Sequence, residues 1–168
     1  MGHQILRECA PGEFDALTYS AWVRIEGLDR WLSSLLLTDG FDAGELHWQI
    51  SDLGELVLGI STEGRGGPNT TSPPVIDPGD LGRWIHLAVT ADRNSGRIIH
   101  YLDGEPVFSD KRSDLPAFRI GRAEIGNWRP IPLKGSPIRS LNGRIGEFVV
   151  LKRALSGDEI RSIYMAGK

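Results

Sequence analysis

The sequence predicts an all-β protein built as a sandwich of two antiparallel sheets, and three observations lead to this prediction. Apolar and polar residues alternate with period two over several segments, as they do in strands buried on one face. The 168 residues include 21 Gly and 10 Pro, which favours short strands joined by tight turns over helices. No internal repeat of about 20 to 50 residues is present, which disfavours propellers and solenoids.

Length, charge and cysteine content limit the class of protein further. We expect a single domain at residues 14–168, long enough to bury a core, after an irregular lead at residues 1–13. The net charge of -3 argues against nucleic acid as a partner. No long apolar run or export signal is present, so we expect no membrane insertion by this chain. Cys9 is the single cysteine, which excludes an intrachain disulfide and a cysteine-rich zinc site.

The N-terminal half is predicted to contain four strands and one long loop. Alternation predicts a strand at residues 17–25, and a nearly continuous apolar stretch predicts a buried strand at 32–38. Residues 45–51 and 55–60 are predicted to form a hairpin, with Gly54 at a position of positive φ. Residues 61–80 are dense in Gly, Pro, Ser and Thr, which predicts one long connection.

The C-terminal half is predicted to contain a ladder of short strands and one helix. Residues 86–90, 97–102 and 105–108 alternate, and Asp103-Gly104 favours a type I′ turn between the last two of these strands. Further strands are expected at residues 118–121 and 144–151, on either side of a loop at 127–143. Ser156 as N-cap and Glu159 at the third helical position form a capping box, with Leu155 and Ile160 as a hydrophobic staple. This pattern predicts one short C-terminal helix.

Three segments of the chain resemble a known family. They are LTYSAWVRIEGLDRWLSSLLLTDG, GRWIHLAVTADRNSGRIIHYLDGEPV and LNGRIGEFVVLKRALSGDEIRSIY, and they occur in the order typical of laminin-G-like, concanavalin-A-like jelly-roll domains. The shorter segments LLLTDGFDAGELHWQI, HYLDGEPV and AEIGNW resemble the C-terminal domain of planctomycete FecR-like regulators. The second resemblance implies a periplasmic or extracellular domain of a longer, membrane-anchored protein.

We expect no catalytic activity from this sequence. Glycosidases of the resembled fold place two carboxylates on one strand, facing the same sugar. The nearest run here is Asp39, Asp42 and Glu45, whose spacing of three residues puts alternate carboxylates on opposite faces of a strand and which is predicted to be a turn. The motifs of serine hydrolases and zinc peptidases are also missing. A glycoside hydrolase is therefore the least favoured alternative.

Calcium is the one cofactor that the sequence leaves open. The resemblance implies a structural ion held by an aspartate of the last strand, but that position is Gly146 here, although Glu147 remains. Asp39, Asp42 and Glu45 offer oxygen ligands without the spacing of a calcium loop, so a solvated acidic turn is favoured over a calcium site.

Tryptophans form the predicted ligand-binding site. A flat ring can stack on a sugar while polar neighbours bind its hydroxyls. Trp22 and Trp84 are on predicted strands and are assigned to the core, whereas three others flank turns or loops. The ligand-binding candidates are Trp128, Asn127, Arg129, Trp48 and Trp31.

The sequence thus predicts a non-catalytic binding module, with carbohydrate as the favoured ligand. That hypothesis requires an exposed tryptophan platform with polar neighbours. The alternative is a protein-interaction or sensor domain, which would present an exposed sheet edge or a flat apolar patch. The identity of the ligand and the oligomeric state are left open.

Overall fold

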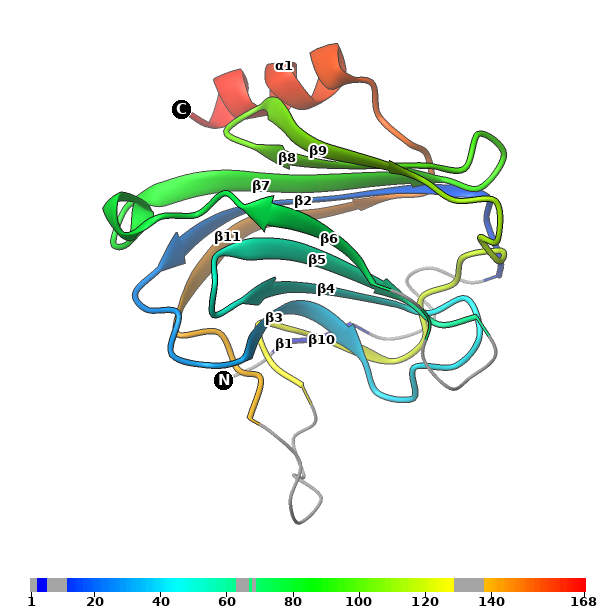
Figure 1. The fold of residues 1–168 in the computed structure, drawn as a ribbon, viewed down its shortest axis with the longest axis horizontal. Coiled ribbons are helices and arrows are strands. Elements are labelled where there is room, and N and C mark those ends of the chain that lie inside the picture. Colours follow the sequence, from blue (N-terminus) through cyan, green and yellow to red (C-terminus); the bar gives the residue numbers. More distant parts are fainter. Residues whose placement is uncertain (1–2, 6–11, 63–66, 68, 129–137) are drawn as a thin grey trace.

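The computed structural model describes residues 3–5, 12–62, 67, 69–128 and 138–168, and they form two antiparallel sheets packed face to face (Figure 1). The strand order is β1-β10-β3-β4-β5-β6 in one sheet and β11-β2-β7-β8-β9 in the other. One short helix, α1, lies at the C-terminal end of the chain. The predicted all-β jelly-roll sandwich with a C-terminal helix is therefore confirmed.

The elements have the following bounds. The six-stranded sheet contains β1 (His3–Ile5), β10 (Ala123–Ile125), β3 (Leu32–Thr38), β4 (Leu46–Ser51), β5 (Glu55–Ile60) and β6 (Thr70–Pro74). The five-stranded sheet contains β11 (Gly143–Leu151), β2 (Ala16–Ile25), β7 (Trp84–Asp92), β8 (Arg97–Leu102) and β9 (Glu105–Lys111). A single 3₁₀ turn, η2 (Pro78–Asp80), and α1 (Gly157–Gly167) complete the described elements.

The core lies between the sheets and follows from the alternation of the strands. In β4, Leu46, Trp48 and Ile50 are fully buried in the core cluster, so the intervening His47 and Gln49 lie on the outer face of the six-stranded sheet. Burial of these apolar side chains supplies most of the free energy that holds the sheets together. The same alternation therefore fixes which side chains can form a site on the outer face.

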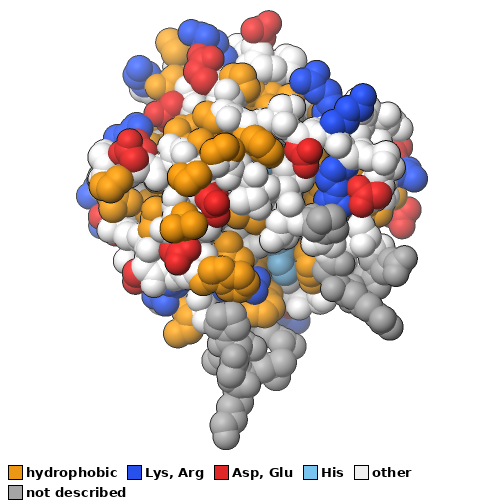
Figure 2. Space-filling model, in the orientation of Figure 1, with side chains coloured by type: hydrophobic (Ala, Val, Ile, Leu, Met, Phe, Trp, Pro, Cys, Tyr) orange, Lys and Arg blue, Asp and Glu red, His pale blue; other side chains and the backbone are white. Residues whose placement is uncertain are grey.

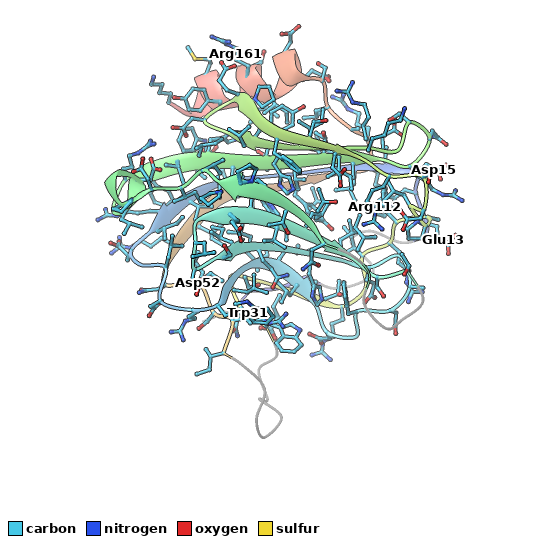
Figure 3. All side chains as sticks on the ribbon, viewed as in Figure 1. Glu13, Asp15, Trp31, Asp52, Arg112 and Arg161 are labelled. Atoms are coloured by element: carbon cyan, nitrogen blue, oxygen red, sulfur yellow. The ribbon has the colours of Figure 1, made fainter. Side chains whose placement is uncertain are left out.

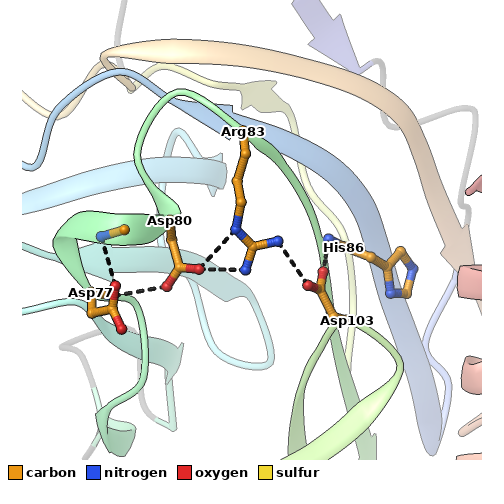
Figure 4. Close-up of polar contacts among 6 residues, drawn as sticks. Asp77, Asp80, Arg83, His86 and Asp103 are labelled. Carbon is orange, nitrogen blue, oxygen red and sulfur yellow. Dashed lines mark hydrogen bonds and ion pairs between the residues drawn. The ribbon is translucent and has the colours of Figure 1, made fainter.

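The predicted type I′ hairpin between β8 and β9 is confirmed, and a polar network holds it in place. Asp103 and Gly104 both have positive φ, 49° and 82°. The Asp103 carboxylate accepts a hydrogen bond from the His86 backbone amide at 2.8 Å and pairs with Arg83 at 3.0 Å (Figure 4). Arg83 also binds Asp80 of η2. The network therefore ties the hairpin turn to the segment that leads into β7.

Helix α1 packs on the outer face of the five-stranded sheet. Ser156 accepts a hydrogen bond from the Glu159 amide and the Glu159 side chain accepts one from the Ser156 amide, which confirms the predicted capping box. Leu155 and Ile160 are buried together against Ala88 of β7, as the predicted staple requires. Within the described residues, no helix has the length and apolar character needed to cross a membrane.

Three expectations about the strands are wrong. The region 61–80 contains β6 and η2 rather than one loop, because an edge strand tolerates proline and β5 needs a partner. The expected strand at 118–121 is reduced to a single bridge between Phe118 and Phe14, and the strand β10 follows it. The lead at 1–13 contributes β1, which pairs with β10. The strand expected at 144–151 is confirmed as β11, in which a bulge with Glu147 at φ 44° interrupts the pairing with β2.

The assignment of two strand tryptophans to the core is also wrong. Trp84 is 44% exposed on the five-stranded sheet, and Trp22 is partly exposed on the outer face of the same sheet. Both residues alternate with buried neighbours such as Ile85 and Val23, so they point away from the core. Trp22 is covered instead by α1, where its ring stacks on Tyr164 with centroids 5.6 Å apart.

Candidate functional site

A pocket of about 250 Å³ opens on the outer face of the six-stranded sheet. The side chains of β4 that alternate with the core provide part of its lining. Gly59 of β5 keeps the pocket open, because a Cβ there would lie within 2.9 Å of the Asn69 side chain. The pocket is lined by Trp31, Leu32, Phe41, His47, Gln49, Gly59, Asn69, Trp128 and Arg139.

Arg139 is close to two tryptophan rings of this pocket. Its guanidinium carbon is 4.6 Å from the centroid of the Trp128 ring and 5.5 Å from that of Trp31. These distances are typical of cation–π contacts. Its Nη1 donates to Gln49 Oε1 at 3.4 Å, and burial lowers the pKa of the guanidinium. The backbone carbonyl of Arg139 accepts from the Ser34 amide at 2.8 Å, which fixes this residue to β3.

Trp128 and His47 share one acceptor, the backbone carbonyl of Thr38. Trp128 Nε1 donates to this oxygen at 3.3 Å and His47 Nε2 lies 3.1 Å from it. Because a carbonyl only accepts, the hydrogen of the neutral His47 ring is on Nε2. Phe41 stacks on the imidazole, with ring centroids 3.9 Å apart.

The pKa of His47 is lowered to about 4, chiefly by burial and in smaller part by the charge of Arg139, while the hydrogen bond to Thr38 acts in the opposite direction. The imidazole is therefore neutral near pH 7. The pocket consequently carries one positive charge, that of Arg139, at neutral pH among the described lining residues.

Trp31 is the exposed aromatic ring of the pocket. It is 64% exposed, and it lies on the side of the sandwich away from α1, where Arg161 is labelled (Figure 3). An exposed ring beside a partly buried one, over a floor of polar side chains, can stack on one face of a ligand and hydrogen-bond to it from below.

A second depression, of about 460 Å³, lies on the five-stranded sheet. Trp22 and Trp84 are its aromatic lining residues. Its other lining residues are Gly146, Glu147, Gly167 and Lys168. Gly146 is the position at which the resemblance implies a calcium-binding aspartate, and a Cβ there would be in ordinary contact with the Trp84 ring, at 3.6 Å.

One pair of side chains resembles a nucleophile and its base, but it is enclosed. Ser20 Oγ is 2.8 Å from His86 Nε2, and both residues are buried. The His86 ring packs under Trp22 and Tyr164, and Asp103 binds the His86 backbone amide rather than its ring. A catalytic triad requires a carboxylate that accepts a hydrogen bond from the imidazole. Among the described residues, His86 Nδ1 has no such partner. We interpret the pair as part of the packing under α1.

A family model described as the concanavalin A-like lectin/glucanases superfamily matches residues 6–161. The chain belongs to this superfamily. A comparison with curated protein sequences gave no match.

Solved structures of the superfamily fold agree in architecture. A protein from Bacteroides ovatus whose provisional name is carbohydrate binding protein is 21% identical with a TM-score of 0.66, over 90% of this chain and 42% of its own. A SAP-like pentraxin from Limulus polyphemus is 16% identical with a TM-score of 0.68, over 96% of this chain and 74% of its own. The binding domain of botulinum neurotoxin serotype D/C is 15% identical with a TM-score of 0.69, over 92% and 37%. At these identities the likeness concerns the fold.

The structure brings together two of the predicted tryptophans and separates the third. Trp31 and Trp128 both line the pocket, whereas Trp48 is fully buried between the sheets of the superfamily fold, 5.9 Å from the Tyr19 ring centroid. Asn127 lies beside the pocket, with its amide nitrogen donating to Glu124 at 3.0 Å. Arg129 lies outside the described residues.

The acidic turn is held by arginines. Asp42 is 3.2 Å from Arg119, Asp39 is 3.5 Å from Arg122, and Glu45 Oε2 accepts from the Asp42 amide at 2.9 Å. In the part of the chain that the structure describes, no three His, Cys, Asp or Glu side chains are grouped to hold a metal ion. Calcium at this turn stays a prediction that the geometry does not favour.

Sequence reasoning missed Arg139, His47 and Gln49 as pocket residues. The alternation of β4 indicates His47 and Gln49, because a core position for Trp48 places its two neighbours on the outer face. Arg139 follows a stretch without periodicity, and it reaches Trp31 and Gln49 only through the fold. No local pattern identifies it.

Proposed function

We propose that this domain is a non-catalytic carbohydrate-binding module whose ligand occupies the pocket on the six-stranded sheet. The observation that carries the proposal is the pairing of Trp31 and Trp128 around Arg139, above His47 and Gln49. Stacking by aromatic rings and hydrogen bonding by a few polar groups are the two interactions that a sugar requires.

The size and lining of the pocket favour a single sugar unit. At about 250 Å³ the pocket is smaller than the range of about 300 to 1,000 Å³ that is usual for drug-sized ligands. The exposed Trp31 ring can pack on the apolar face of a sugar, and the Gln49 and Asn69 amides can bind hydroxyl groups. We therefore expect recognition of a terminal residue or of one residue within a longer chain.

Membership of the superfamily and the names of the structural neighbours support a binding role. One neighbour carries the provisional name of a carbohydrate-binding protein and another is a toxin binding domain. The chain spans 42% of the first of these proteins, so this support concerns one domain and not the whole of it. The resemblance to FecR-like regulators adds a proposed setting, a periplasmic or extracellular domain of a membrane-anchored protein.

The test is calorimetric titration of the domain with a panel of polysaccharides and oligosaccharides. We expect a saturable interaction that Trp31→Ala and Trp128→Ala each weaken by about tenfold or more. Trp84→Ala is the matched control, since it removes an exposed tryptophan from the opposite sheet. Repeating the titration with a chelator tests calcium. If no glycan binds, or if the pocket variants bind as well as the wild type does, the proposal is wrong.

The depression on the five-stranded sheet supports a second candidate function, a protein-interaction or sensor domain. Trp84 and Trp22 offer an apolar surface there, of the kind that protein partners cover. The same variants separate the two functions. Binding of a protein partner that is lost in Trp84→Ala and retained in Trp31→Ala would favour this second function.

A further inference from the structure

Arg139 differs from most arginines of this protein in having no acidic partner within 4.0 Å among the described residues. Arg83, by contrast, pairs with both Asp80 and Asp103. The described lining of the pocket contains no Asp or Glu. On the face shown in Figure 2, acidic and basic side chains are interspersed rather than gathered by sign. The positive charge of Arg139, unpaired within the described part of the chain, is therefore a property of this pocket and not of the whole visible surface.

The hydrogen-bonding capacity of Arg139 is also mostly unused. A guanidinium has five N–H donors. The described residues provide one acceptor, Gln49 Oε1 at 3.4 Å, and the buried Nε has none. A partly buried cation without an acidic partner is unfavourable, and a charged acceptor would offset that cost.

The position of the guanidinium is fixed before any ligand arrives. The rings of Trp31 and Trp128 both lie within 5.5 Å of its central carbon, and the Arg139 backbone is bonded to Ser34 of β3. A positioned guanidinium matches the geometry of a carboxylate or sulfate, to which it donates two parallel hydrogen bonds. Preorganisation of this kind reduces the entropy lost on binding.

We propose, on the basis of the carbohydrate-binding function above, that the pocket selects acidic sugars, with the carboxylate or sulfate of the ligand bound by Arg139. The tryptophan rings then contact the apolar face of the same sugar. Gln49, which now accepts from Arg139, is free to turn its amide toward a hydroxyl when the acid takes its place.

The experiment compares matched neutral and acidic oligosaccharides by calorimetry. The pairs are galactose and galacturonic acid oligomers, lactose and sialyllactose, and unsulfated and sulfated galactan fragments. We expect the wild type to bind at least one acidic member about tenfold or more tightly than its neutral partner, as a charge-assisted hydrogen bond predicts. The carboxylate pairs and the sulfate pair distinguish the two sources of charge.

Two substitutions of Arg139 and one control assign the preference to the pocket. Arg139→Gln should remove the preference for the acidic member, and Arg139→Lys should keep it in weaker form, because lysine retains the charge without the paired donors. Arg97→Gln, on the exposed surface of β8, changes the net charge equally and should leave the preference intact. Thermal unfolding of each variant confirms that it is folded.

The outcomes separate the two proposals. Equal binding of neutral and acidic members, or a preference that survives in Arg139→Gln, overturns the selection of acidic sugars and leaves carbohydrate binding standing. Failure of every glycan to bind overturns both.

Discussion

The two outer faces of the sandwich differ in what covers them. On the five-stranded sheet, α1 packs through Ile160 on Tyr101 of β8, and both side chains are buried. On the six-stranded sheet the described residues place no helix, and Trp128 and Arg139 border an open pocket. The faces belong to the same sandwich, yet one is closed by packing and the other is open to a ligand.

The difference follows from the side chains that each strand turns outward. The outward residues of β7 and β8 include Ala88 and Tyr101, whose burial requires an apolar cover. The outward residues of β4 are His47 and Gln49, which find hydrogen-bond partners in Thr38 and Arg139. An apolar face has to be covered for stability, whereas a polar face can remain available for binding.

The covered face can be opened by removing the anchor of α1. We expect Ile160→Ala to lower the free energy of unfolding by about 2 to 5 kcal/mol, because it leaves a cavity among buried side chains. Chemical denaturation measures the change. Met165→Ala is the control, since Met165 is 60% exposed on the same helix and its loss should have little effect. Equal effects of the two substitutions would show that α1 is not docked as described.

Acidification should destabilise the open face and the sheet edge through buried histidines. Burial lowers the pKa of His47 and of His100 to about 4, so both are neutral in the folded chain at pH 7. The unfolded chain takes up protons below pH about 6.5, and the folded chain does so only near pH 4. Stability is therefore complete above pH about 6.5 and falls as the pH decreases toward 4, by up to roughly 3 kcal/mol for each histidine.

The measurement is the free energy of unfolding at a series of pH values for the wild type, His47→Gln and His100→Gln. In each variant the free energy of unfolding should change less between pH 6.5 and 4 than it does in the wild type. His100 bonds the Thr70 carbonyl through Nε2 at 3.3 Å, so its variant also tests the contact between β8 and β6. Identical pH profiles in all three proteins would show that His47 and His100 do not cause the loss of stability at low pH.

The N-cap of α1 should contribute less to the free energy of unfolding than Ile160 does. Ser156→Ala removes the N-cap hydroxyl that accepts from the Glu159 amide, and it should cost about 1 kcal/mol. Ser162→Ala, within the same helix, is the matched control, because its hydroxyl bonds the Asp158 carbonyl and contributes no cap. A larger effect at Ser162 than at Ser156 would argue against the capping role.

The smallest effect on stability is expected at the open face. Trp31→Ala removes a ring that is 64% exposed, and it should change the free energy of unfolding by no more than about 1 kcal/mol, the value of its contact with Arg139. The same substitution should abolish most of the glycan binding. A large loss of stability would instead make Trp31 a structural residue.

The elements that depend on neighbouring residues were predictable from the sequence. The alternation of β2 and β4, the Asp103-Gly104 turn and the capping box of α1 are all encoded within a few residues. β6 was not predictable, since Thr70–Pro74 becomes a strand only because β5 needs a partner at the sheet edge.

The site was predicted in part, and Arg139 is the residue that the sequence did not reveal. Trp31 and Trp128 were identified as loop aromatics, but the third predicted ring, Trp48, is a core residue. Arg139 lies far from Trp31 and Gln49 in the sequence, and only the packing of a loop against β3 and β4 brings them together. Such a convergence of distant segments has no local sequence signature.

The position of Arg139 between two indoles has a practical consequence. The emission of Trp31 and Trp128 depends on the cation beside them, so an acidic ligand that binds the guanidinium in place should change their emission. Trp48 is enclosed between the sheets, and Trp22 and Trp84 lie on the opposite sheet, so none of the three lines the pocket. The native sequence therefore contains an optical reporter of occupancy that needs no label.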